Sequence, residues 1–373
     1  MKKLFFALAT VCFASIFAMS AGMHDEYFKK DLKENERLDN QKNGQSPVLD
    51  QGHPVKKHQM RDAYSAPGRI NTNNPWNFFL WGKFLYWQAL QEEMSLGKNY
   101  TLINGVENGH VVNMSFDYTP AFKVGLGFHF THDDWSLLAE YTRYYSINSH
   151  TERSSDLISV DQSWWPNAVD SNYEEMIYGK WTLQMNLIDL HLMRSYYLGT
   201  HLLLLPYFGM RVGLIDQKLD AYYMPFLTTD QVYCHAKSTS WAVGPRAGID
   251  LHWYFAHTFF LYSNLAASLP YTQYKVYHKA YYEYIPEDLD WNYSDKYNFL
   301  RPNLELILGL AWGDYIYDNK VHLDIFAGYE FHTFWGQNMM KFYADKTQCN
   351  QLGTAYPGNL YLHGLSTGML INW

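Results

Sequence analysis

The sequence is poor in cysteine, in long apolar segments and in basic charge. Only three of its 373 residues are cysteine, and one of these, Cys12, belongs to the apolar segment near the N-terminus. After Gly22, no apolar stretch approaches the roughly 20 residues that a membrane-spanning helix needs. The 16 histidines show no spacing typical of zinc ligands. We therefore expect neither a spanning helix after residue 22 nor a metal ion or other cofactor.

The first residues are typical of a secretory signal peptide. Lys2 and Lys3 precede an apolar run from Leu4 to Phe17, and small residues that offer cleavage points follow it up to Gly22. We therefore expect residues 1–22 to be removed on export. Residues 23–75 are polar and contain several prolines, so they are predicted to form a flexible periplasmic segment.

The exported chain is acidic and rich in aromatic residues. Two of the 29 Lys and Arg residues lie in the signal segment, so 27 remain against 37 Asp and Glu, a net charge of −10. This balance argues against nucleic acid as a partner. Aromatic residues make up 18% of the chain. Outer-membrane β-barrels need such residues for the girdles at the two membrane surfaces, so the composition suits a barrel.

Several segments alternate between apolar residues and polar or small ones, most clearly 120–130, 240–255 and 321–331. A helix would scatter the apolar residues around its circumference, whereas a strand places them on one face. The segment 361–373 shows the same pattern and ends in an aromatic residue, as expected of the closing strand of an outer-membrane barrel. Its bulky face is predicted to face lipid and to serve as a C-terminal insertion signal, with Tyr361, Met369, Ile371 and Trp373.

Residues 76–373 are predicted to form ten strands, at about 76–90, 120–130, 135–146, 177–194, 201–215, 239–255, 259–271, 297–312, 320–332 and 358–373. The alternation slips by one near Ile188, which predicts a bulge. Short and long connections alternate, as the short periplasmic turns and long external loops of outer-membrane barrels do. The predicted fold class is therefore all-β, a transmembrane antiparallel up-and-down β-barrel of about ten strands.

Charged residues gather on the predicted inward faces of these strands. Lys83, Lys180 and Glu140 belong to this set, together with the residues predicted to line a pore: Lys123, Arg211, Arg246, Asp250, Arg301, Glu305, Asp324 and Glu330. They either line an aqueous path and set its selectivity, or pair with one another and fill a narrow lumen. Near-balanced charge suits a paired network at least as well as a strongly selective pore.

Two cysteines, Cys234 and Cys349, fall in predicted external loops. An oxidising compartment permits a disulfide between them, and two free thiols are the alternative. Sequence alone leaves both open.

Ten short stretches, spread in order over the predicted barrel, carry a resemblance to a known family. They are Trp81–Ala89, Phe122–Phe128 with His132–Trp135, Ile188–Leu192, Arg194–Tyr197, Pro206–Arg211, Ile215–Lys218, Arg301–Leu306, Ala327–Glu330 and Leu360–Leu365. In these stretches the chain resembles the Legionella-type major outer membrane protein family, which also occurs in chlamydia-like bacteria. The resemblance implies a surface-exposed, pore-forming outer-membrane barrel without catalytic residues.

The first hypothesis for the function is passive diffusion of small hydrophilic solutes through a porin-like barrel. The alternative is a structural or adhesive surface barrel with a plugged lumen. An enzyme is not expected: Gly364–Gly368 matches a nucleophile elbow but lies inside a strand, and His235 and Asp216 lack a convincing partner set. The expected partners are outer-membrane lipid, the barrel-assembly machinery, solutes, further copies of the chain and host surfaces.

Overall fold

The computed structural model describes residues 70, 72, 77–130, 134–153, 157–160, 174–225, 231–282, 291–340 and 357–373. The predicted signal peptide, nearly all of the predicted periplasmic segment and Cys349 lie outside these residues. No helix in the described ranges is long and apolar enough to cross a membrane.

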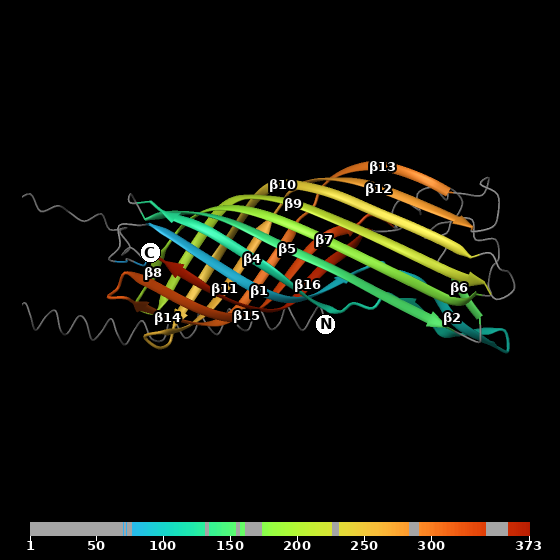
Figure 1. Ribbon diagram of the computed structural model, residues 1–373, viewed down its shortest axis with the longest axis horizontal. Helices are drawn as coiled ribbons and strands as arrows, with labels where there is room; N and C mark the ends of the chain where they lie inside the picture. Colours follow the sequence, from blue (N-terminus) through green and yellow to red (C-terminus); the bar gives the residue numbers. More distant parts are fainter. Residues whose placement is uncertain are drawn as a thin grey trace, which may run out of the picture. The chain divides into compact units, whose positions relative to one another are not determined.

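Ten strand positions close into an antiparallel barrel. β1 (Phe78–Gln91) pairs with β4 (Tyr118–His129) on one side and with β16 (Gly358–Asn372) on the other, so the sheet has no edge at this level (Figure 1). The remaining wall strands follow in the order β5 (Trp135–Arg153), β7 (Glu174–Arg194), β9 (Leu202–Pro225), β10 (Val232–Tyr254), β11 (Phe259–Ser268), β14 (Asn303–Ile316) and β15 (Val321–Asn338). The predicted ten-stranded antiparallel barrel is confirmed.

Short connections gather at one end of the barrel and long ones at the other. The short-turn end, where β8 (Tyr196–Leu198) adds a brief pairing to β9, is the periplasmic end in barrels of this kind. At the opposite, external end the first long connection forms a hairpin of β2 (Ser95–Ile103) and β3 (Val106–Asn113). A short strand, β6 (Leu157–Val160), pairs with β2.

Two adjacent wall strands are interrupted at prolines. Pro270 separates β11 from β12 (Tyr271–Tyr282), and Pro302 separates β13 (Trp291–Leu300) from β14. Proline has no amide hydrogen to donate to the ladder, which explains why pairing stops there. β10 pairs with β11 near the periplasmic end and with β12 farther out, so the β12–β13 hairpin continues the wall externally.

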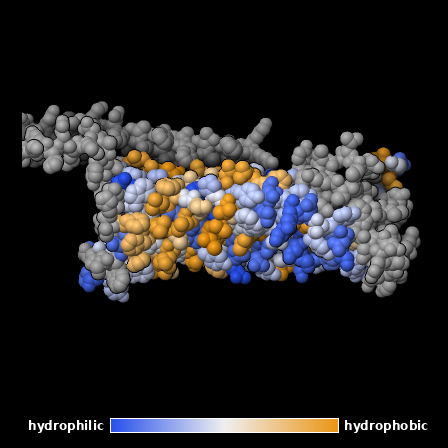
Figure 2. Space-filling view, turned by 90° about the horizontal axis from the view of Figure 1, so that it is seen from above, coloured by the Kyte–Doolittle hydropathy of each residue, from blue (hydrophilic) through white to orange (hydrophobic). Residues whose placement is uncertain are grey.

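The polarity of the wall changes along its length. On β7, Ile188 and Leu190 are 52% and 47% exposed on the outer surface, within an apolar belt. Farther out on the same face lie Thr182 and Gln184, while the inward Trp181 is completely buried. Figure 2 shows this belt in orange, followed externally by a hydrophilic band in blue. The barrel therefore has a lipid-facing half and an external half built like a water-soluble protein.

This change of polarity overturns two expectations. Pairing of β7 with both neighbours runs without interruption from Met176 to Met193, so the bulge predicted near Ile188 is wrong. The alternation slips there because the apolar residues move from the outer face to the inner face, while the backbone continues. For the same reason Lys180 lies on the outer face and not in the lumen, as the burial pattern of its neighbours shows.

The two halves of β7 should respond differently to the same substitution. Leu190→Arg places a charge in the apolar belt and should lower the free energy of unfolding in lipid vesicles by about 2–4 kcal/mol. Thr182→Arg, on the same face and strand, should change it by less than about 0.5 kcal/mol because that position meets water. Equal losses in urea titrations of the two variants would contradict the assignment.

Candidate functional site in the barrel lumen

The lumen contains a central layer of buried ion pairs. Arg211 of β9 donates from Nε and Nη2 to the two carboxylate oxygens of Asp189 of β7, at 2.6 Å each. Its Nη1 donates to Glu305 of β14. Arg211 is only 2% exposed, and both carboxylates are 1% exposed. The planar guanidinium thus uses both edges to join two carboxylates across the lumen.

Glu305 also accepts from a second arginine. Arg246 of β10 donates to its Oε1 and Oε2 at 2.7 and 2.8 Å. The Nε atom of Arg246 lies 3.2 Å from the Nε2 atom of His191, whose Nδ1 atom lies 3.4 Å from Glu140. One carboxylate therefore holds two arginines, and the chain of contacts continues to β5.

The opposite side of the layer centres on Glu330 of β15, which is completely buried. Lys83 of β1 donates to its Oε1 at 3.2 Å, and the Nζ atom of Lys123 of β4 lies 4.0 Å from its Oε2. His332 lies between the two halves, with ring nitrogens 3.2 Å from Glu330 and 3.5 Å from Glu305. The network therefore spans the lumen.

The layer is balanced in charge. Its four cations are Lys83, Lys123, Arg211 and Arg246, and its four carboxylates are Glu140, Asp189, Glu305 and Glu330. Removing one partner of a buried ion pair leaves an uncompensated charge and costs about 3–5 kcal/mol. The layer therefore acts as a brace across the lumen, in which each charged side chain needs its partners. Because its charges balance, it has no net charge with which to select ions.

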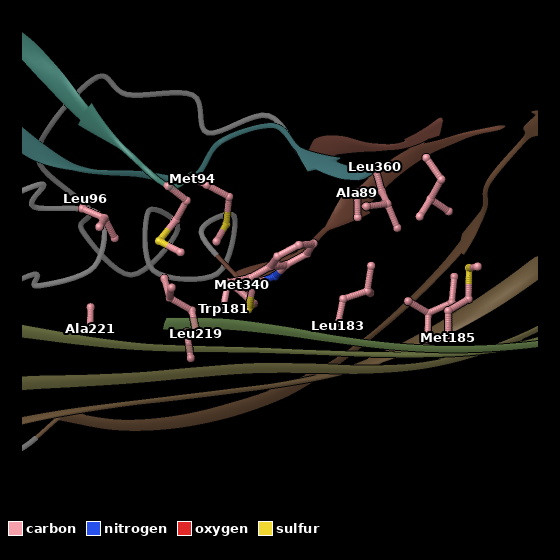
Figure 3. Packing of buried hydrophobic residues seen from close by; sticks show 14 of the residues in the cluster. Ala89, Met94, Leu96, Trp181, Leu183, Met185, Leu219, Ala221, Met340 and Leu360 are labelled. Atoms are coloured by element: carbon pink, nitrogen blue, oxygen red, sulfur yellow. The ribbon is translucent and has the colours of Figure 1, made fainter. Parts of the chain in front are cut away.

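External to this layer, the lumen is filled by apolar side chains. Trp87 of β1, Trp181 of β7 and Leu219 of β9 point inward and are completely buried. The segment that follows β1 adds Met94 and Leu96, which lie opposite the inward side chains of β7 and β9 in Figure 3. The cluster also contains Ala89, Val112, Met114, Leu183, Met185, Ala221, Met340 and Leu360. We call this set the apolar plug.

On the periplasmic side of the charged layer lies a chamber. It has a volume of about 200 Å³, and Trp81, Tyr207, Tyr262 and Phe326 contribute aromatic walls. The Nζ atom of Lys83 lies 5.2–5.9 Å from the ring centroids of Trp81, Tyr262 and Phe326, a distance that suits cation–π contact. A second cavity of about 630 Å³ at the periplasmic end shares Phe260 and Asp324 with it.

The sequence-predicted pore-lining residues fall into three places. Lys123, Arg211, Arg246, Glu305 and Glu330 meet in the charged layer. Asp250 and Asp324 line the periplasmic chamber, where Asp250 accepts from Asn264. Arg301 lies apart at the Pro302 break, 4.3 Å from the ring centroid of Phe299 and with Nη2 3.6 Å from the Met339 sulfur. Whether any of them lines a conducting path stays a prediction.

Sequence reasoning missed Asp189, His191 and His332 as members of the layer. The sequence did not predict Asp189 as an inward residue, because the alternation of apolar and polar residues shifts by one position next to it. The histidines carried no signal in the sequence beyond their inward phase. Glu140, Asp189 and His191 lie close enough to suggest a cation site. However, both oxygens of Asp189 already accept from Arg211, so the arrangement is accounted for by ion pairs.

The remaining candidate residues lie in the outer parts of the fold. His235 pairs through Nδ1 with Asp220 at 2.6 Å, not with Asp216, and both side chains lie on the outer face of the external wall. Cys234 is buried, with its Sγ atom 3.2 Å from Nε2 of His278, and its predicted disulfide partner, Cys349, lies outside the described residues. On β16, Met369 is 53% exposed on the outer face, with Tyr361, Ile371 and Trp373 in the same phase.

Comparison with known proteins places this barrel among outer-membrane proteins. A sequence model of the family described as Legionella pneumophila major outer membrane protein precursor matches residues 71–371. No curated protein sequence matches. Among solved structures, the outer membrane protease OmpT from Escherichia coli aligns at 10% identity with a TM-score of 0.43, covering 82% of this chain and 99% of that chain. A Pseudomonas aeruginosa FadL homologue aligns at 8% identity with a TM-score of 0.25, covering 83% and 96%.

The charged layer should be sensitive to the loss of one carboxylate. Glu305→Gln leaves Arg211 and Arg246 without their shared partner and should lower the free energy of unfolding by about 3 kcal/mol or more. Asp117→Asn, an exposed position with the same change in charge, should shift it by less than about 0.5 kcal/mol. Equilibrium unfolding of both variants by urea measures the difference, and a Glu305→Gln barrel as stable as the wild type would show that the layer is not a brace.

Proposed function

We propose that this chain, which belongs to the family of the Legionella pneumophila major outer membrane protein, is a structural surface barrel of the outer membrane with a closed lumen. In this role it spans the outer membrane and holds a rigid external wall and its loops above the lipid surface. The single observation that carries the proposal is the apolar plug, whose side chains are buried inside the external half of the lumen.

The wall itself supports closure as much as the segments inside it do. Leu183, Met185 and Ile215 belong to the strands of the barrel, and their inward side chains are buried. A porin holds water against a polar inner surface. Here these apolar side chains would remain on the inner surface, beside polar ones such as Gln217 and Ser238, even if the Met94–Leu96 segment moved away. An apolar lining of this kind favours packing or dewetting over a water-filled path.

The charged layer adds a second barrier to solutes. Its carboxylates are shared among cations from several strands, so an ion that crosses this level must displace pairs that are already formed. Buried pairs are costly to break because each leaves an unpaired charge behind. The proposed role is therefore not enzymatic and not conductive, because the charged side chains of the layer are paired with one another.

Passive diffusion of small hydrophilic solutes is the second candidate. It is favoured by the periplasmic chamber, which reaches Lys83, Arg246 and Glu305 and so provides part of an aqueous route. Conduction through the full length would require Met94, Leu96 and Met340 to leave the lumen. Under either proposal, residues 1–22 are a signal peptide that is cleaved on export, which the intact mass of the membrane-extracted protein would test.

Single-channel recording in a planar bilayer separates the two functions. The refolded wild-type barrel should show no stable conductance steps, whereas Met94→Glu/Leu96→Glu, which puts two carboxylates into the apolar plug, should produce them once Glu305→Gln also weakens the charged layer. Leu102→Glu, at a position of the same hairpin that is 55% exposed, should stay silent. Reproducible steps from the folded wild-type barrel would overturn closure and establish the pore.

A further inference from the structure

The outer face of the external wall carries a concentration of lysines. Outward positions on β7, β9, β10, β12 and β13 hold Lys180, Lys218, Lys237, Lys275, Lys279 and Lys296. Among the side chains that the structure describes on this face of the same strands, the acidic ones are Asp216 and Asp220. The carboxylate of Asp220 already has two partners: Nζ of Lys218 lies 2.8 Å from its Oδ2, and Nδ1 of His235 lies 2.6 Å from its Oδ1. The six lysines, which we call the lysine band, therefore carry excess positive charge on a chain that is acidic overall.

Two pairs within the lysine band stand directly opposite each other on neighbouring strands. Lys218 of β9 is in register with Lys237 of β10, and Lys275 of β12 is in register with Lys296 of β13. All four side chains are exposed. Like charges directly opposite in a sheet are destabilising, and Lys237, Lys275 and Lys296 form no ion pair with a residue that the structure describes. An anion placed between them would remove this repulsion.

The lysine band borders the apolar belt. Trp241 marks the end of the belt on β10, where its indole donates to Gln273 and packs near Tyr271, as girdle residues do. Lys237 follows four residues farther out on the same face, and the Lys275–Lys296 pair follows two residues beyond Gln273 and its partner Asn298. At about 3.3 Å per residue, the Cα atoms of these lysines lie roughly 7–13 Å along their strands from the girdle. Figure 2 shows the hydrophilic band directly beside the belt.

We propose that the lysine band binds the phosphate groups of lipopolysaccharide, the anionic glycolipid of the outer leaflet. The depth of the band matches the headgroup region, because it begins where the lipid-facing surface ends. Lysine binds phosphate as a flexible point charge, and rows of basic residues beside a membrane surface bind anionic lipid headgroups. Acyl chains of the same molecule would pack on the belt below, so a lipid fits both surfaces at once.

The test uses the full-length barrel folded in a zwitterionic detergent and purified lipopolysaccharide as the probe. The variants Lys275→Gln/Lys296→Gln and Lys218→Gln/Lys237→Gln should each bind at least about tenfold more weakly, because each loses charge-assisted contacts to phosphate. Lys98→Gln/Lys320→Gln removes the same charge from exposed positions elsewhere and should leave the affinity within about twofold of the wild type.

Two further measurements keep the result interpretable. Enzymatically dephosphorylated lipopolysaccharide should bind the wild type as weakly as the intact lipid binds the variants. In the absence of lipid, the variants should melt at the same temperature as the wild type or higher, because the repulsion between opposed lysines has been removed. Unchanged affinity in both lysine variants, an equal loss in the control, or equal binding of the dephosphorylated lipid would overturn the proposal.

Discussion

A strand that leaves a membrane changes solvent along its own length, and this constraint organises the whole barrel. In the periplasmic half, lipid surrounds the wall, so apolar residues such as Leu190 face outward and polar residues such as Asp189 face inward. In the external half, water surrounds the wall, so Trp181 turns inward and Thr182 outward. The charged layer belongs to the interior of the half that lipid surrounds, and the apolar plug is the interior of the half that water surrounds.

The charged layer lies at the level of the wall where apolar residues change from the outer face to the inner face. Polar side chains directed inward in the lipid half must find partners, because buried charges without partners are strongly unfavourable. Arg211, Glu305 and Glu330 meet this requirement by pairing across the lumen instead of with water. In the external half an apolar cluster packs inside the wall, together with buried polar side chains such as Gln217 and Ser238. The lumen is thus closed in two ways: by ion pairs in the lipid half and by packed apolar side chains in the external half.

The sequence was informative about the membrane half and misleading about the external half. Alternation in segments such as 120–130 and 321–331 predicted strands and their phase, and it predicted Arg211, Arg246, Glu305 and Glu330 as inward residues. The same rule failed at Lys180, because alternation reports which residues match the solvent and not which way they point. The pairing of Glu305 with two arginines depends on strands distant in sequence, so no local pattern could reveal it.

A spin-label scan along β7 from residue 180 to 192, in a cysteine-free background, measures most directly how the surroundings of this strand change along its length. Collision with oxygen reports lipid, and collision with a water-soluble nickel complex reports water. The even positions should pass from water access at 180–186 to lipid access at 188–192, while the odd positions stay shielded from both. Access of the nickel complex to positions 181, 183 and 185 in the folded barrel would instead reveal a water-filled lumen and contradict the closed interior.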